Sequence, residues 1–151
     1  MSEYRLFKEI IALSVAKNWE EAKKEWVLDH IYEAKEAQTC LCGHYPIIEI
    51  CTIRNVKNNE HALVGNCCIN KFLGLGSDKM FNSLKRIRKD ITKSVSKTLI
   101  DFAHEKKILN DWEYKFYSDT CRKRKLSTAQ RNKKIDINGK ILREIDKKSA
   151  N

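Results

Sequence analysis

Apolar residues in the first quarter of the chain recur at the three- to four-residue spacing of amphipathic helices. Residues 2–17 form one such stretch, which begins at a serine that can cap a helix. A second stretch covers residues 18–35 and opens with Asn18 and Glu21, the pattern of a capping box. No proline or glycine interrupts either stretch, so residues 1–38 are expected to form an N-terminal helical hairpin.

The pattern changes between residues 39 and 76, where glycine, proline and β-branched residues replace the helical periodicity. Residues 47–53, Ile-Ile-Glu-Ile-Cys-Thr-Ile, predict a strand. After a polar turn at 55–60, residues 61–64 can return as its antiparallel partner, and a short helix is expected over 67–73. This part of the chain is therefore predicted to be a β-hairpin that leads into a helix.

Helical periodicity returns in residues 77–151 and predicts a bundle of three or four helices. Asn138-Gly139 favours a break in the last of them. Each of the three tryptophans recurs at helical spacing with other apolar residues, so Trp19, Trp26 and Trp112 are expected in the core. The predicted helix caps are Ser77, Thr92, Asn110 and Ser127.

The composition is that of a folded domain, because 42 % of the 151 residues are hydrophobic and 33 % are charged. The sequence contains no apolar run of about 18 residues that would span a membrane. Its first residues lack the basic-then-apolar pattern of a secretory signal. We therefore expect a cytoplasmic protein, and in a reducing compartment clustered cysteines bind metal more often than they form disulfides.

Five of the six cysteines fall between Cys40 and Cys68. The segment 40–44, Cys-Leu-Cys-Gly-His, places two thiols and an imidazole in one turn, but a tetrahedral zinc site needs further ligands from elsewhere. This turn at 40–44, the knuckle, is followed by the predicted hairpin and the predicted helix, which is the order of a treble-clef zinc finger. Ordinary buried cysteines are the alternative, and spacing leaves the choice of four ligands open. The six candidates are Cys40, Cys42, His44, Cys51, Cys67 and Cys68.

The expected zinc site is structural, and we expect no catalytic residues and no enzymatic activity. A catalytic zinc keeps an open coordination position and commonly uses histidine or carboxylate ligands. Four thiolates would fill the coordination shell and leave a poor Lewis acid. A zinc-dependent nuclease on this scaffold would need a histidine on the helix, where Asn70 and Lys71 stand. That alternative is therefore the least favoured.

Three segments, Cys-Leu-Cys-Gly-His at 40–44, Ile-Cys-Thr-Ile-Arg-Asn at 50–55 and Val-Gly-Asn-Cys-Cys-Ile-Asn-Lys-Phe at 64–72, resemble a motif in a family of small uncharacterised proteins of bacteriophages and bacteria. Residues 110–130 are similar to the phage proteins as well. The resemblance implies a phage-encoded protein in the host cytoplasm, and no biochemical activity comes with it. It implies as zinc ligands the cysteines that recur in the family, with two residues in reserve. The ligands are Cys40, Cys42, Cys51 and Cys68, and the reserves are His44 and Cys67.

The net charge of +10 is concentrated toward the C-terminus. Residues 77–111 carry 9 basic and 5 acidic side chains, a net +4, and residues 112–151 carry 12 and 5, a net +7. This asymmetry predicts an acidic partner, either nucleic acid or, as the alternative, a host protein that the chain would inhibit during host takeover or against host defence. A solvated helix face is the plainer interpretation of any single basic run. The predicted phosphate contacts are Lys85, Arg86, Arg88, Lys89, Arg122, Lys123, Arg124, Lys125, Arg131, Lys133 and Lys134.

These expectations describe a mostly helical α+β protein, a helical bundle with an inserted treble-clef-like zinc hairpin. The N-terminal hairpin occupies residues 1–38, the zinc module residues 39–76 and the basic helical region residues 77–151. The expected cofactor is structural Zn²⁺, whose binding free energy would substitute for a core that so short a module cannot build. The leading function is a nucleic-acid-binding accessory protein.

Overall fold

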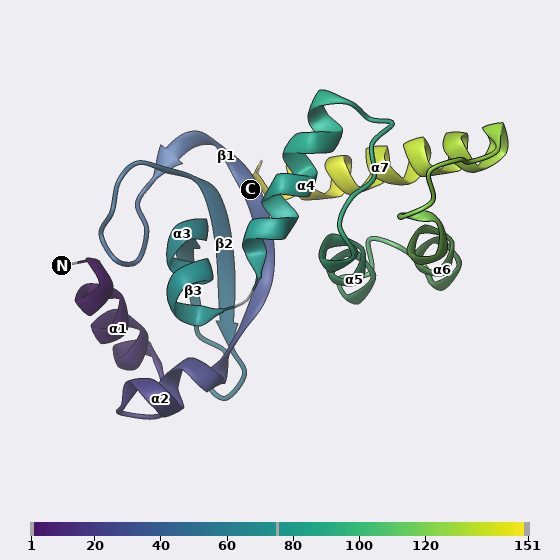
Figure 1. Cartoon of the computed structure of the whole chain (residues 1–151). Coiled ribbons are helices and arrows are strands. Elements are labelled where there is room, and N and C mark those ends of the chain that lie inside the picture. The colour runs from purple at the N-terminus through teal and green to yellow at the C-terminus, as the bar shows by residue number, and fades with distance from the viewer. Residues whose placement is uncertain (1, 75, 150–151) are drawn as a thin grey trace. The chain divides into compact units, whose positions relative to one another are not determined.

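The computed structural model describes the backbone of residues 2–74 and 76–149, and the side chains of these residues except 2–4 and 72. The chain forms two compact units (Figure 1). Unit 2 comprises residues 78–147, and unit 1 comprises the rest of the described chain. The α+β class predicted from the sequence is confirmed, since helices predominate and one small antiparallel sheet accompanies them. No described helix is long and apolar enough to span a membrane.

Unit 1 contains a three-stranded antiparallel sheet in the order β1-β2-β3. The hairpin of β2 and β3 and the helical turn after it were predicted, and the structure confirms them. The helical turn packs on β2, as Figure 1 shows. The elements are α1 (Ser2–Leu13), α2 (Trp19–Ala22), η1 (Lys23–Glu25), β1 (Trp26–Gln38), β2 (Ile47–Asn55), β3 (His61–Gly65), α3 (Asn66–Cys68) and η2 (Ile69–Leu73).

The second predicted helix is wrong over most of its length, because β1 replaces it from Trp26 onward. Asn18 does cap a helix, and its side chain accepts a hydrogen bond from the Glu21 N–H at 3.0 Å, but α2 has only four residues. The strand pairs with β2, and its register shifts between Leu28 and His30. Such a bulge breaks the strict alternation of buried and exposed residues, so apolar positions along β1 imitate helical spacing. The expected N-terminal helical hairpin is therefore replaced by helix α1, the short helices α2 and η1, and strand β1.

A buried carboxylate, Glu25, fixes the chain between α1 and the sheet. It accepts hydrogen bonds from the N–H groups of Val15 and Ala16 and from the side-chain amide of Asn55, all at 2.8 Å. The hydrogen bond from the Asn55 amide contributes most to lowering the pKa of Glu25. Burial alone would raise this pKa, but the Asn55 amide and the two N–H groups together outweigh that effect. One anion therefore joins the end of α1 to the end of β2.

Two of the four helix caps predicted for residues 77–151 are confirmed. Ser77 is instead the first residue of a helix, and its hydroxyl is hydrogen-bonded to Asn66. The caps predicted at Asn110 and Ser127 are both confirmed, and each forms the reciprocal hydrogen bonds of a capping box. The cap predicted at Thr92 is wrong, because Thr92 bonds to Asp90 in the preceding turn and Ser96 caps the helix instead. The helices are α4 (Ser77–Lys89), α5 (Lys97–Glu105), α6 (Asp111–Thr120) and α7 (Thr128–Ser149).

The break predicted at Asn138-Gly139 is also wrong, since α7 runs through it without interruption. Asn138 is fully buried, and its amide donates to the carbonyls of Ile91 at 2.9 Å and Lys93 at 2.7 Å. Its Oδ1 accepts from the Tyr117 hydroxyl at 2.6 Å, and that hydroxyl accepts from the Val95 N–H at 3.1 Å. The polar side chain that suggested a helix break is used to hold the connection between α4 and α5.

Replacing Asn138 with alanine should lower the free energy of unfolding by about 2–3 kcal/mol, because it leaves buried carbonyls and the Tyr117 hydroxyl without partners. Urea unfolding followed by circular dichroism measures the loss. Asn132→Ala, an exposed change on the same helix, is the matched control. Equal stability of the two variants would contradict a stabilising role for the hydrogen bonds of Asn138, here called the Asn138–Tyr117 clamp.

Replacing Glu25 with glutamine should destabilise the protein at neutral pH and matter less in acid. The pKa of Glu25 is lowered by folding, so its contribution is present above the ordinary carboxyl pKa of 4.5 and is lost as the pH falls through the lower folded value. Thermal unfolding of both proteins from pH 7 downward should show their midpoints converging. A difference that does not change with pH would mean that the charge of Glu25 contributes nothing.

Candidate metal centre and basic surface

A tight turn between β1 and β2 presents the first two sulfurs of the cluster. The Cys40 carbonyl accepts the Gly43 N–H at 2.8 Å, and the Cys40 N–H donates to the carbonyl of His44 at 2.9 Å. Gly43 has a φ of +93°, a conformation that favours glycine. The Leu41 N–H donates to the Leu63 carbonyl at 3.1 Å, which ties the turn to β3. Local sequence and sheet contacts together set the position of the knuckle.

The third sulfur comes from α3, which follows β3 directly. The Sγ atoms of Cys40, Cys42 and Cys68 all lie within 4.8 Å of one another. The Gly65 N–H donates to the Cys40 Sγ at 3.3 Å, so the end of β3 contacts the knuckle. A tetrahedral zinc site with Zn–S bonds of about 2.3 Å places its sulfurs about 3.8 Å apart. The three thiols are therefore close enough to hold a metal ion together.

Hydrogen bonds within the cluster favour a thiolate at Cys40. The Cys68 thiol is the strongest donor to it, the N–H groups of Gly65 and Cys42 add to the effect, and together they outweigh burial and lower the pKa of Cys40 to about 5. The same contact raises the pKa of Cys68, because the Cys40 thiolate holds its proton. The cluster thus carries negative charge at neutral pH, which favours binding of a cation.

The other three candidate ligands lie outside this group of three. Cys51 is fully buried on β2, paired in register with Val64, and burial raises the pKa of its thiol to about 12. His44 and Cys67 are exposed. The structure therefore brings together three of the four cysteines that the resemblance implies, and it places Cys51 beside the cluster without including it.

A second set of hydrogen bonds holds α3 against the sheet. Asn66, the first residue of α3, donates from its amide to the Glu49 carboxylate at 3.2 Å and is hydrogen-bonded to the Ser77 hydroxyl. That hydroxyl also acts to lower the pKa of the Cys51 thiol, against the larger effect of burial. The residues around the sulfur cluster are thereby linked across β2, α3 and the start of α4.

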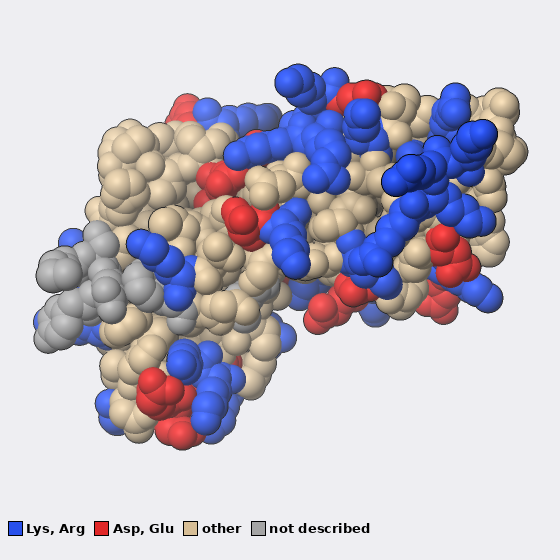
Figure 2. All heavy atoms as spheres, viewed as in Figure 1, with Lys and Arg blue, Asp and Glu red and all other residues tan. Residues whose placement is uncertain are grey.

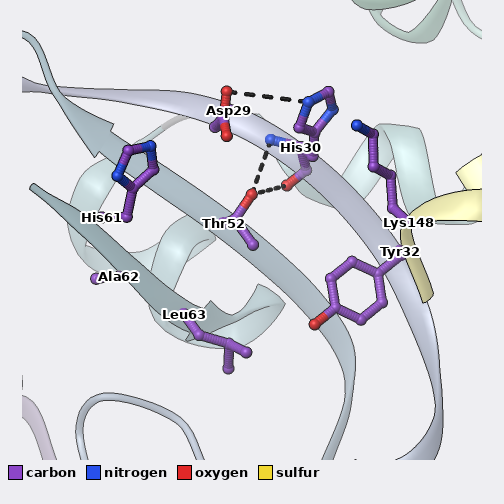
Figure 3. A pocket seen from close by; sticks show the side chains of 8 residues that line it. All are labelled: Asp29, His30, Tyr32, Thr52, His61, Ala62, Leu63 and Lys148. Carbon is purple, nitrogen blue, oxygen red and sulfur yellow. Dashed lines mark hydrogen bonds and ion pairs between the residues drawn. The ribbon is translucent and has the colours of Figure 1, made fainter. Parts of the chain in front are cut away.

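A pocket of about 470 Å³ lies over the sheet of unit 1, and Figure 3 shows the side chains that line it. Thr52 Oγ1 accepts the His30 N–H at 3.1 Å, and the Asp29 carboxylate lies 4.0 Å from the His30 ring. Among the described residues, the histidine and carboxylate atoms here do not form a group of three within 4.8 Å. The lining residues are Asp29, His30, Tyr32, Thr52, His61, Ala62, Leu63 and Lys148.

The net charge of the protein resides in unit 2. Residues 78–147 carry 20 Lys and Arg and 10 Asp and Glu, a net +10, whereas the rest of the chain carries 10 of each. Figure 2 shows Lys and Arg side chains crowded over α4 and over the connection between α6 and α7. The asymmetry seen along the sequence is therefore a division between a neutral unit and a strongly basic one.

The predicted phosphate contacts are distributed over three parts of unit 2. Arg122 to Lys125 lie in the exposed connection after α6, so this run is not helical and its side chains are not forced around a helix. Arg88 on α4 is paired with Asp146. The remaining exposed or half-buried candidates are Lys85, Arg86 and Lys89 on α4 and Arg131 and Lys133 on α7.

Lys134 does not belong to the exposed set, which corrects its assignment as a phosphate contact. Its side chain is buried, and its Nζ donates to Ser94 Oγ at 3.2 Å. Burial lowers the pKa of Lys134, and the neighbouring charges of Arg131 and Lys93 lower it further. The serine contact places this lysine in the packing of α7 against the connection between α4 and α5.

Trp112 was expected in the core, but 59 % of it is exposed. It stacks on Phe116, with ring centroids 5.3 Å apart, and the Lys133 ammonium lies 5.2 Å from its ring centroid. The buried stripe of α6 contains Glu113 and Tyr117 instead. Trp112 and Phe116 are four residues apart, as are the buried Glu113 and Tyr117, and each precedes its buried neighbour by one residue. Periodicity alone therefore could not tell which of the two pairs faces the core.

Comparison of the chain with protein-family models, with curated proteins and with solved structures found no match.

Replacing Cys68 with serine should weaken metal binding by more than roughly 100-fold, because even outer contacts of a metal site are worth 10- to 100-fold and Cys68 is one of the three clustered sulfurs. Cys67→Ser is the matched control, since the neighbouring thiol is exposed and outside the cluster. Competition with a chromophoric zinc chelator measures both affinities. Equal affinity of the two variants would contradict the assignment of Cys68.

Proposed function

We propose that this protein binds nucleic acid through the basic surface of unit 2, and that a structural zinc ion in unit 1 stabilises its fold. The observation that carries the proposal is the charge division, with the net +10 confined to residues 78–147. A phosphate backbone is the polyanion that such a surface suits best, since releasing its counterions drives association.

The zinc half of the proposal rests on Cys40, Cys42 and Cys68, with Cys51 as the fourth ligand. Cys51 is close enough to the cluster for the Cys40 charge to act on its pKa, and its thiol is already buried. A fourth thiolate would complete a closed tetrahedral shell of the structural type. The knuckle, the β2–β3 hairpin and α3 follow one another in the treble-clef order.

The phosphate-binding half rests most on Arg122 to Lys125. All four side chains are exposed, and among the described residues they form no ion pair. Other cations of unit 2 are partly neutralised, as Lys140 is by Glu113 at 2.9 Å and Lys97 is by Asp101 at 2.6 Å. The connection between α6 and α7 is therefore the part of unit 2 most able to exchange water and counterions for phosphates.

Neutralising Arg122 to Lys125 with glutamine should reduce affinity for nucleic acid and reduce the slope of log affinity against log salt by about 3–4, since each phosphate contact contributes about 0.7–0.9. Fluorescence-anisotropy titration of single-stranded and duplex DNA and RNA at several salt concentrations measures both effects. The matched control changes four exposed lysines of unit 1 to glutamine: Lys8, Lys17, Lys24 and Lys35.

The control variant should keep the wild-type affinity and slope, although its change in net charge is the same. Equal losses in the two variants would show that net charge alone matters and would contradict an interface at the α6–α7 connection. No binding to any of these polymers at low salt would contradict the function itself and direct attention to an acidic protein partner.

A further inference from the structure

We propose that Trp112 and Phe116 form a base-stacking platform, and that the nucleic acid bound by this protein is single-stranded. The proposal rests on the nucleic-acid function of unit 2 and adds the kind of polymer and the residue that recognises it. The ring pair lies on α6, in the same unit as the excess positive charge.

The exposure of Trp112 is the first observation. Large aromatic side chains stabilise a fold mainly by leaving water, yet 59 % of this indole stays in contact with solvent. The Trp112 and Phe116 rings are inclined by only 11°, with centroids 5.3 Å apart, so they stack face to face with an offset, and a further flat ring can extend this stack from its outer, flat surface. A nucleobase is the common ligand that offers a flat face to such a surface, and stacking accepts every base.

The rigidity of the platform is the second observation. Trp112 lies in the first turn of α6, where Asn110 Oδ1 accepts the Glu113 N–H at 2.8 Å and Glu113 Oε1 accepts the Asn110 N–H at 3.0 Å. Glu113 is buried and is also paired with Lys140 at 2.9 Å. The helix start that carries the indole is therefore fixed before any ligand binds, which reduces the entropy lost on binding.

The charge around the rings is the third observation. The Lys133 ammonium lies over the Trp112 ring, 5.2 Å from its centroid, so a positive charge is next to the stacked rings. At 1.5 Å per residue, the eight residues from Trp112 to the end of α6 at Thr120 rise about 12 Å, and Arg122 follows directly after. That distance corresponds to about four nucleotides at 3.4 Å each along a stacked strand. A strand of about that length is therefore long enough to reach from the platform to Arg122.

Single strands are favoured over duplexes because of what the platform can reach. The faces of bases inside a duplex are covered by their stacked neighbours, so an exposed ring on a helix surface meets only unpaired bases. A duplex would still contact the lysines and arginines of unit 2 through its phosphates. The expected signature is a preference for single strands that the Trp112→Ala change lowers at every salt concentration.

Unit 1 contains a matched control for this platform. Trp19 and Phe7 also stack, with centroids 4.0 Å apart and an angle of 23° between the rings, but they lie in the unit without net charge. The third tryptophan, Trp26, is buried. Tryptophan fluorescence can therefore be assigned by comparing Trp112→Phe with Trp19→Phe in the full chain.

The experiment titrates oligothymidylate of 15 nucleotides, and a DNA duplex of equal length, into the wild-type protein, Trp112→Ala, Trp112→Phe and Trp19→Phe. Binding is followed by anisotropy of a labelled strand and by quenching of tryptophan fluorescence. Trp112→Ala should weaken single-strand binding by about 5- to 150-fold, the effect of losing one stacked base, with an unchanged salt slope and unchanged duplex affinity. Quenching should persist in Trp19→Phe and disappear in Trp112→Phe, which should keep part of the affinity.

Three outcomes would overturn the proposal. Single-strand affinity of Trp112→Ala equal to the wild type would show that the indole stacks on no base. Equal losses for single strand and duplex, with thermal stability unchanged, would assign Trp112 to general surface contacts. If the wild-type protein binds neither polymer at low salt, the nucleic-acid function itself is contradicted. This outcome differs from failure of the platform alone, in which the wild type binds and Trp112→Ala binds equally well.

Discussion

The rest of unit 1 depends on the contact among the sulfurs of Cys40, Cys42 and Cys68, because this contact joins distant parts of the chain. The turn with Cys40 and Cys42 follows strand β1, and Cys68 lies after the β2–β3 hairpin. The sulfur contact therefore connects the two ends of the segment that contains this hairpin. Cys40 also accepts the Gly65 N–H, which sets the end of β3 and the start of α3. A cation bound there would replace thiol protons that the lowered pKa of Cys40 already makes easy to lose.

The two units differ in charge and in the contacts that stabilise them. Unit 1 has balanced charges, a small sheet and buried polar groups such as Glu25 that are fully paired. Unit 2 has helices fixed by caps and by the Asn138–Tyr117 clamp, and its surface carries the whole charge excess. A surface so basic repels itself, and the internal ion pairs of Lys97 and Lys140 offset part of that repulsion. Binding a polyanion would offset more of it.

Much of this structure follows from local sequence, and the exceptions have definite physical causes. The caps at Asn110 and Ser127 and the hairpin of β2 and β3 depend on neighbouring residues, so the sequence predicts them. Strand β1 could not be recognised, because its pairing with β2 is a tertiary contact and its bulge hides the two-residue alternation. Asn138 has the composition of a helix break, and only the distant carbonyls of Ile91 and Lys93 explain its place inside α7.

The candidate site divides in the same way. Spacing and resemblance indicated cysteines of one cluster, and three of the four implied ligands lie together, whereas the position of Cys51 beside them depends on how α3 packs on β2. The exposure of Trp112 and the burial of Lys134 depend on which face of each helix the neighbouring helices cover, which periodicity alone does not determine.

The central claim is that a metal ion bound by cysteine sulfur stabilises unit 1. X-ray absorption at the zinc edge of the purified protein tests it most directly. The account predicts one zinc per chain with a first shell of sulfur alone at about 2.3 Å. Nitrogen or oxygen ligands at about 2.0–2.1 Å in half of the shell would contradict the thiolate site, and a folded protein purified without any metal would contradict the claim itself.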